Sequence, residues 1–200
     1  MSSFGAVPID FKALDIDFLI SSSNKCIEGV PGFSFVIFKK SSLENCNLNA
    51  RTVSLDLYSQ WKYMINGHQF RFTPPIQSIL AFRKAIDELK EEGGVQKRSE
   101  RYRQNYDRLI EGTETLGIKT YLNKQDQGYI ITSFLFPEHP NFDFTRFYEK
   151  LHDRGQVIYQ GKLSDTDCFR IGNIGQLYLD DIDKLLSAIS EVLYELEVNF

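Results

Sequence analysis

The sequence predicts an α/β protein, because short strand-like segments are followed by longer segments with helical periodicity. Two apolar runs near the amino terminus, 17–20 and 33–38, contain aromatic and β-branched residues and are bounded by Ser, Gly and Pro. Such runs are typical of buried strands. In the second half of the chain, apolar residues recur about every 3.6 residues in some segments and every second residue in others. This change indicates helices packed on a small sheet.

The remaining elements follow from turn, cap and periodicity signals. A helical turn is predicted at 9–14, a polar irregular segment at 39–53, a short helix with Ser54 as its N-cap, and a turn at 66–67. Prolines 74 and 75 fix the start of a helix that ends at glycines 93 and 94, and a second helix follows. We then expect a strand at 129–136, a helix at 142–154, strands at 157–159 and 168–171, and a final helix with one apolar stripe from Ile182 to Leu196.

The composition excludes several classes of function. Of 200 residues, 42% are hydrophobic and 25% charged, which is ordinary for a soluble globular protein, and the net charge of −4 argues against nucleic-acid or anionic-membrane binding. Cys26, Cys46 and Cys168 are odd in number and lack metal-ligand spacing, so we expect free thiols, no metal site and a cytoplasmic protein. No signal peptide and no run of membrane-spanning length is evident.

Lys25 is the first candidate for chemistry. It lies in the Ser- and Gly-rich loop Ser21-Ser22-Ser23-Asn24-Lys25-Cys26-Ile27-Glu28-Gly29, between the two apolar runs. An amine partly removed from water loses some of its preference for the charged form and can condense with an aldehyde to a Schiff base. The alternative is a solvated turn residue.

Arg170 and Thr73 are the other candidates. Arg170 lies in a predicted strand, where its planar guanidinium suits a carboxylate or phosphonate, or an internal ion pair to Asp167 or Asp165. Thr73 precedes the proline-started helix, where its hydroxyl suits a phosphate or acts as an N-cap. Ser22 and Asn24 suit hydrogen bonds either to a cofactor or within their loop.

Several separated motifs resemble the 2-aminoethylphosphonate:pyruvate aminotransferase family, within the class V pyridoxal-phosphate (PLP) aminotransferases. They are the stretch from Asp17 to Phe33, the threonine of Arg71-Phe72-Thr73-Pro74-Pro75, the segment Phe169-Arg170-Ile171-Gly172-Asn173-Ile174-Gly175, and the shorter segments 54–58 and 90–95. Together they extend over nearly the whole chain and occur in the family's order.

The resemblance implies a function and a site. Lys25 would be the catalytic and cofactor-bearing lysine, Ser22 and Asn24 would assist cofactor binding, and Thr73 would reach the cofactor phosphate of a neighbouring subunit in a homodimer. Arg170 would bind the anionic end of the substrate. The implied reaction transfers the amino group of 2-aminoethylphosphonate to pyruvate, with pyridoxal 5'-phosphate as cofactor, in phosphonate catabolism.

The resemblance also implies a partial chain. The family aspartate that pairs with the pyridine nitrogen lies some 25 residues before the lysine, and counting back from Lys25 passes beyond Met1. We therefore expect the carboxyl-terminal portion of the enzyme, with the end of the large-domain sheet at 1–75 and a small α/β domain at 76–200. Two alternatives are another class V aminotransferase acting on a small amino acid, and a non-catalytic remnant or dimerisation module.

Overall fold

The structure, a computed structural model, describes residues 1–161 and 166–198 and divides the chain into two compact units. The first unit is Met1–Gln96 and the second is Lys97–Phe200. Contacts therefore group the helix after Pro75 with the first unit, whereas the division predicted from the resemblance begins the second domain at residue 76. That predicted division concerns the family's domains and stays a prediction.

The first unit contains the predicted pair of strands. β1 (Phe18–Ser22) and β2 (Ser34–Phe38) are antiparallel, with Ile20 opposite Val36. The prediction that both strands are buried is wrong for this chain: Leu19 and Ser21 are buried, but Phe18 and Ile20 are 38% and 56% exposed. Successive side chains of a strand point to opposite faces, and only one face of this hairpin is covered by described residues.

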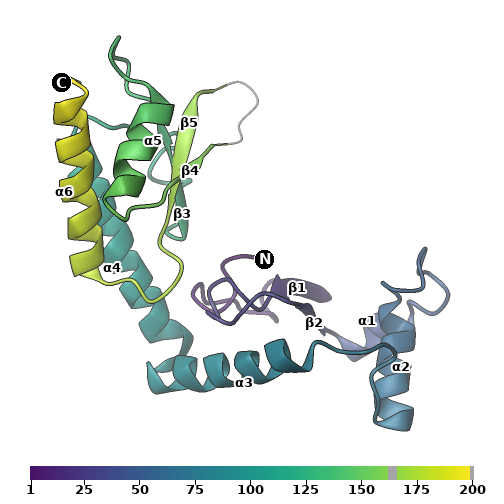
Figure 1. Cartoon of the computed structure of the whole chain (residues 1–200). Coiled ribbons are helices and arrows are strands. Elements are labelled where there is room, and N and C mark those ends of the chain that lie inside the picture. The colour runs from purple at the N-terminus through teal and green to yellow at the C-terminus, as the bar shows by residue number, and fades with distance from the viewer. Residues whose placement is uncertain (162–165, 199–200) are drawn as a thin grey trace. The chain divides into compact units, whose positions relative to one another are not determined.

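Helix α3 (Ile76–Glu91) provides that cover (Figure 1). Its Ala85 and Leu89 form a buried cluster with Ile27, and Phe82 packs beside them. The Phe82 ring centroid lies 5.3 Å from that of Phe33 and 5.3 Å from that of Phe35. The helix begins directly after Pro75, as the two prolines predict.

Two short helices precede α3, and one of them was not expected. α1 (Lys40–Glu44) occupies part of the segment predicted to be irregular, and its Leu43 is buried. α2 (Leu57–Gly67) begins after Asp56, whose carboxylate accepts from the Ser59 N–H at 3.0 Å, so the N-cap is Asp56 and not Ser54. The predicted turn at 66–67 is the end of α2, followed by His68 with a positive φ of 52°.

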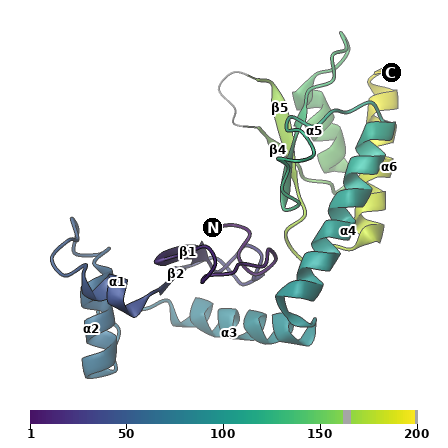
Figure 2. The same cartoon turned by 180° about the vertical axis from the view of Figure 1, so that it is seen from behind.

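The second unit is the small α/β layer that the change of period predicts. Helix α4 (Gly94–Thr115) precedes strand β3 (Ile131–Leu135), helix α5 (Phe144–Asp153), strands β4 (Tyr159–Gln160) and β5 (Cys168–Gly172), and helix α6 (Leu179–Glu195). The strands are antiparallel in the order β3-β5-β4. In Figures 1 and 2, α5 and α6 lie side by side against the sheet.

The core of this unit is formed between the helices and one face of the sheet. Phe169 of β5 is fully buried, and its ring centroid lies 5.5 Å from that of Phe134 on β3 and 5.6 Å from that of Phe147 on α5. The apolar stripe of α6 joins this cluster, as predicted, through Ile182, Leu185, Leu186, Ile189, Val192 and Leu193.

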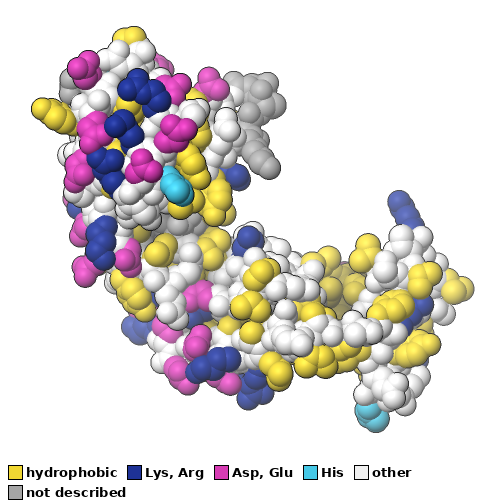
Figure 3. All heavy atoms as spheres, viewed as in Figure 1, with side chains coloured by type: hydrophobic (Ala, Val, Ile, Leu, Met, Phe, Trp, Pro, Cys, Tyr) yellow, Lys and Arg dark blue, Asp and Glu magenta, His cyan; other side chains and the backbone are white. Residues whose placement is uncertain are grey.

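Acidic and basic side chains are interspersed on the visible surface over α5 and α6 (Figure 3). None of the helices in the described residues has the length and hydropathy needed to cross a membrane.

Candidate active site

Lys25 lies in the connection between β1 and β2, three residues after the end of β1. Lys25 is half-buried, so it is partly removed from water and is not a fully solvated turn residue. Within residues 1–161 and 166–198, its Nζ makes no hydrogen bond and no ion pair. The amine is therefore available to a ligand.

The loop around Lys25 is closed by hydrogen bonds that involve Ser23. The Ser23 hydroxyl donates to the Val30 carbonyl at 2.7 Å and is 3.3 Å from the Phe33 carbonyl. The Ser23 N–H donates to the same Phe33 carbonyl, and the Gly29 N–H donates to the Ser23 carbonyl at 3.0 Å. These bonds fix the backbone on both sides of Lys25.

A tight turn follows directly. The Glu28 N–H donates to the Lys25 carbonyl at 2.7 Å, and Glu28 has a φ of 64°. A residue other than Gly in this left-handed region carries some backbone strain, which persists only where surrounding contacts hold it. The strain therefore adds to the indication that the shape of this loop is imposed by its packing.

The loop is also packed against α3. Cys26 and Ile27 are buried, and Cys26, Cys46 and Cys168 form no disulfide. At Gly29, an added Cβ would lie 2.8 Å from the Ser23 carbonyl oxygen and 3.3 Å from the Phe82 ring. The Ser78 hydroxyl of α3 donates to the Pro31 carbonyl at 3.2 Å. The glycines therefore permit a close approach that larger residues would prevent.

Ser22 and Asn24 flank Ser23 and differ from it. Both are half-buried, and neither side chain makes a hydrogen bond with any other residue in the described part of the chain. The alternative explanation, that they cap the loop, is not supported by these contacts, because Ser23 has that role. Sequence reasoning missed Ser23. The signal that could have found it is the two-residue period of a strand, which, extended from Leu19, places positions 21 and 23 on the same face; the structure buries all three.

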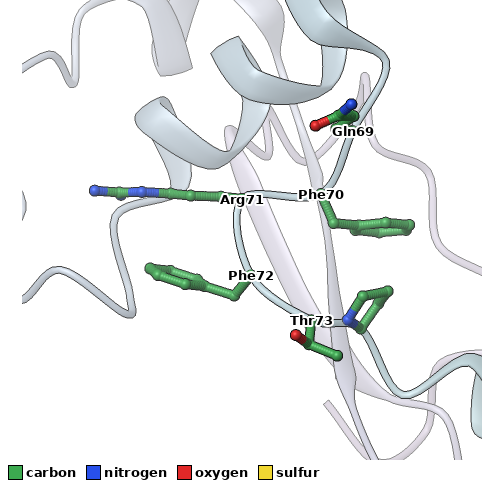
Figure 4. Close-up of a pocket in the computed structure, with 6 residues that line it drawn as sticks. Gln69, Phe70, Arg71, Phe72 and Thr73 are labelled. Carbon is green, nitrogen blue, oxygen red and sulfur yellow. The ribbon is translucent and has the colours of Figure 1, made fainter.

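Thr73 lies in the segment between α2 and α3 and is exposed. The first helical residue of α3 is Ile76 and its N-cap is Pro75, with no side-chain cap, so the alternative of Thr73 as N-cap is wrong. Its hydroxyl makes no hydrogen bond with a described residue. Thr73 is one of the residues that line an open depression formed by 69–74, in which Phe70 extends to one side of the backbone and Arg71 and Phe72 to the other (Figure 4).

Arg71 holds this segment to the start of α2. Its Nη1 lies 3.2 Å from the Asp56 carboxylate and donates to the Val53 carbonyl at 3.2 Å. Its guanidinium carbon lies 5.2 Å from the centroid of the Phe72 ring. The pKa of Asp56 is lowered, first by its hydrogen bonds from Ser59 and then by the charge of Arg71.

Arg170 lies on the central strand of the second unit, opposite Ser133 of β3 and Tyr159 of β4. Its side chain is half-buried, and its Nε is buried without a hydrogen-bond partner among the described residues. The alternative ion pair to Asp167 is not formed, and Asp165 lies outside the described residues. A buried guanidinium nitrogen without a partner carries a desolvation cost, which a bound anion would offset.

The predicted site residues thus fall in both units. Lys25, Ser22, Asn24 and Thr73 belong to the first unit and Arg170 to the second. No hydrogen bond joins Lys25 to Thr73. One feature recurs in all of them: a polar side chain that makes no hydrogen bond or ion pair with the described residues around it.

These residues fit the cofactor that the resemblance implies. The Lys25 amine has no partner among the described residues, as a group that is to be bonded to an aldehyde requires. The hydroxyl of Thr73 and the side chains of Ser22 and Asn24 offer hydrogen bonds suited to a phosphate or a ring substituent. Across residues 1–161 and 166–198, no group of three or more His, Cys, Asp or Glu is arranged to hold a metal ion.

Comparisons with known proteins place the chain in a family. The family described as aminotransferase class-V matches residues 1–162. Proteins named 2-aminoethylphosphonate–pyruvate transaminase from Klebsiella pneumoniae and from Salmonella typhimurium are each 51% identical over 195 residues, which is 97% of this chain and 53% of theirs. The chain therefore spans about half the length of the curated relatives it matches.

Solved structures show the same fold. An alanine–glyoxylate aminotransferase from Nostoc sp. matches with a TM-score of 0.83 at 24% identity, over 96% of this chain and 52% of that one. A pyridoxamine–pyruvate aminotransferase from Mesorhizobium loti matches with a TM-score of 0.86 at 18% identity, over 98% of this chain and 51% of that one. The expected α/β fold of PLP-dependent transferases is thereby confirmed. By family match and by sequence identity, the chain belongs to the class V aminotransferases, a family of enzymes that use pyridoxal phosphate.

Proposed function

We propose that this chain is the part of a PLP-dependent aminotransferase that carries the cofactor lysine, and that the whole protein transfers the amino group of 2-aminoethylphosphonate to pyruvate. The products are phosphonoacetaldehyde and alanine, so the reaction belongs to phosphonate catabolism. The names of the relatives that are 51% identical support this choice of substrates over those of other class V aminotransferases. At this identity, substrate preference is more often shared than in the matches of 18–24%.

The observation that carries the proposal is the Lys25 amine, without a partner among the described residues, on a loop held by backbone contacts. Lys25 would hold the cofactor through this amine, whose chemistry suits covalent attachment to an aldehyde with loss of one water molecule. When bound, the cofactor supplies an electron sink for the bonds around the substrate carbon. Lys25 would also serve as the base that holds and returns the proton moved in the exchange.

Arg170 binds the anionic end of the substrate in this proposal. Its guanidinium presents paired N–H groups that match the oxygens of a phosphonate in one half-reaction and of a carboxylate in the other. The lack of an ion pair to Asp167 supports this role, since the charge is not already neutralised by that neighbour.

Thr73, Ser22 and Asn24 hold the cofactor in this proposal. The Thr73 hydroxyl would help to hold the cofactor phosphate of a second subunit, which requires a homodimer. Helix α2 supports a partner of some kind, because no residue of this 11-residue helix is buried, and helices of that length are marginal without packing. Tyr63, Met64 and Ile65 of this helix are about half exposed, and apolar side chains gather in that region of Figure 3. A cytoplasmic location completes the proposal.

A chimera tests the function. The part of the Klebsiella relative that this chain does not match is joined to this chain, and the product is incubated with pyridoxal phosphate. One portion is reduced with borohydride to make the attachment permanent for mass analysis, and a second, unreduced portion is assayed for activity. We expect the mass of the cofactor on the peptide containing Lys25, and alanine formation from 2-aminoethylphosphonate and pyruvate. Lys25→Ala should abolish both, whereas Lys12→Ala, which removes an exposed lysine of the same unit, should preserve both.

The substrate is tested separately. Conversion of 2-aminoethylphosphonate should exceed that of small amino acids, and Arg170→Lys should raise its KM more than it lowers kcat, because a point charge replaces a planar fork. Preference for a small amino acid would transfer the proposal to another class V activity. A folded chimera that never acquires the cofactor at Lys25 would favour the non-catalytic dimerisation module instead.

A further inference from the structure

We propose that Ser23 is the positioning residue of the cofactor lysine: its hydroxyl fixes the loop that holds the Lys25 amine in the orientation needed for attachment. This inference rests on the proposed function of Lys25, but it concerns a different residue and a different contact. Ser23 touches neither substrate nor cofactor in this account, and it acts through the backbone of the loop.

Burial and bonding distinguish Ser23 from its neighbours. Its side chain is fully buried, and it donates inward to the Val30 carbonyl at 2.7 Å, seven residues along the chain. The same oxygen is 3.3 Å from the Phe33 carbonyl, at the point where the chain enters β2. One hydroxyl therefore joins the beginning of the loop to its end, on either side of Lys25.

The backbone of Ser23 makes two further bonds, which do not depend on its side chain. Its N–H donates to the Phe33 carbonyl and its carbonyl accepts from Gly29. Replacing Ser23 by Ala keeps these two bonds and the pairing of β1 with β2. We therefore expect the variant to fold, with a loop that is tied at its backbone but no longer fixed at Val30.

Ser23 and its two neighbours differ in the direction of their side chains and therefore in their proposed roles. Ser22 and Asn24 are half-buried, and their side chains make no hydrogen bonds with described residues, so they remain available for a ligand. Ser23 faces the interior between them. A catalytic group on a loop needs such support, because small displacements of a reacting atom lower the rate strongly.

Ser21 offers a matched control on the same strand face. It is 2% exposed, and its hydroxyl donates to the Met1 carbonyl at 2.7 Å, outside the Lys25 loop. Ser21→Ala and Ser23→Ala each remove one buried hydroxyl that bonds a backbone carbonyl. They differ in whether that carbonyl belongs to the Lys25 loop.

The first measurement needs no cofactor. Hydrogen exchange of the Gly29 amide reports on its bond to the Ser23 carbonyl, and we expect exchange to become about tenfold faster in Ser23→Ala and to stay unchanged in Ser21→Ala. The variant keeps the Gly29–Ser23 backbone bond, but opening of the loop no longer requires the hydroxyl bond to the Val30 carbonyl to break. A tenfold change corresponds to the loss of that one hydrogen bond of ordinary strength. The second measurement is the rate at which the chimera described above acquires the cofactor at Lys25, followed by visible absorbance, with the pH midpoint of that absorbance as a spectroscopic signature.

We expect Ser23→Ala to slow cofactor attachment about tenfold and to shift the pH midpoint. Ser23→Cys keeps a similar size and a weak donor, so its attachment rate and midpoint should lie between those of Ser23→Ala and the unaltered protein. Unaltered attachment and midpoint in Ser23→Ala, even with faster exchange, would overturn the inference. If Ser23→Ala does not fold, Ser23→Cys decides by the same criteria. Failure of the unaltered chimera to acquire cofactor would instead refute the proposed function.

Discussion

The Gly29 amide donates to the Ser23 carbonyl oxygen at 3.0 Å and closes the loop in which Lys25 lies. The two residues also approach each other too closely for a side chain at position 29, because a Cβ there would lie 2.8 Å from that oxygen. The loop is thus shaped by a serine that bonds inward and a glycine that permits contact. A single lysine is left outside these contacts, which is the arrangement that a rigid support for a reactive amine requires.

Gly29→Ala should destabilise the first unit. The new methyl group meets a backbone oxygen and the Phe82 ring, neither of which can move without disturbing the Lys25 loop, so we expect a loss of about 1–3 kcal/mol in the free energy of unfolding, as for other overpacked sites. Chemical denaturation measures this loss. Gly67→Ala is the control, since nothing lies within 4 Å of a Cβ at that position of α2. Equal stability of the two variants would show that the loop yields to the methyl group.

The N-cap of α2 should make stability depend on pH. The pKa of Asp56 is lowered from its ordinary value of 3.8, first by the hydrogen bonds from Ser59 and then by Arg71. A carboxyl group with a lowered pKa in the folded state contributes stability above its ordinary value, and this contribution is lost as the pH falls through the lowered value. The melting temperature should therefore decrease as the pH is lowered below about 4.

Asp56→Asn isolates the charge in that experiment, because asparagine caps helices about as well as aspartate. The variant should lose stability near neutral pH, where the ion pair to Arg71 at 3.2 Å is present in the parent. The difference between the two melting temperatures should shrink as the pH falls below 4. A difference that is independent of pH would mean that the charge of Asp56 has no part in holding α2 to the segment of Thr73.

Regular elements were predicted from the sequence where one signal dominates. The stripe from Ile182 to Leu196 has a single period, and the structure has α6 there. The α1 helix was missed because its five residues are too few to display a period, and its only buried side chain is Leu43. The N-cap of α2 was assigned to Ser54 although Asp56 is an equally good cap, since choosing between two cap residues requires knowledge of where the apolar face begins.

The candidate site could be predicted only in part, for a related reason. Lys25, Thr73 and Arg170 were identified by chemistry and by family resemblance, which depend on residue type. Ser23 was missed because it is the last of three consecutive serines. The sequence distinguishes them only by which face of an extended chain each one occupies. Its role depends on the Val30 carbonyl, a backbone atom that the sequence cannot locate before the loop is folded. Caps and turns bond the backbone within about four residues and leave a pattern in the sequence, whereas the Ser23 bond spans seven residues and depends on the folded loop.

The connection after β5 should depend on a tyrosine of α4. The Tyr102 hydroxyl accepts the Gly175 N–H at 3.0 Å, and Tyr102 is fully buried. Tyr102→Phe leaves this amide without that acceptor, so we expect a loss of about 1 kcal/mol in the free energy of unfolding. Tyr106→Phe on the same helix is the control: its pKa is raised chiefly by burial, and its hydroxyl makes no hydrogen bond with a described residue. Similar losses in both variants would contradict the stated role of the Tyr102 hydroxyl.

Arg170 should show opposite effects on stability and on binding. Its Nε is buried without a partner among the described residues, so the folded state bears the cost of removing that group from water. Arg170→Met keeps much of the volume and removes the unpaired group, so we expect the free energy of unfolding to stay the same or to rise by about 1 kcal/mol, as when other poorly compensated buried charges are replaced. Denaturant unfolding measures this change.

In the chimera, the same substitution should raise the KM for an anionic substrate at least tenfold, because the guanidinium is lost. Arg108→Met is the control for charge: Arg108 forms an ion pair of 2.6 Å with Asp183 on the surface, so its removal should change stability by less than about 1 kcal/mol and leave the KM unaltered. If Arg170→Met instead destabilised the protein by several kcal/mol, as removal of one member of a buried ion pair does, Arg170 would be a structural partner of another charge and the substrate role would have to be given to another residue.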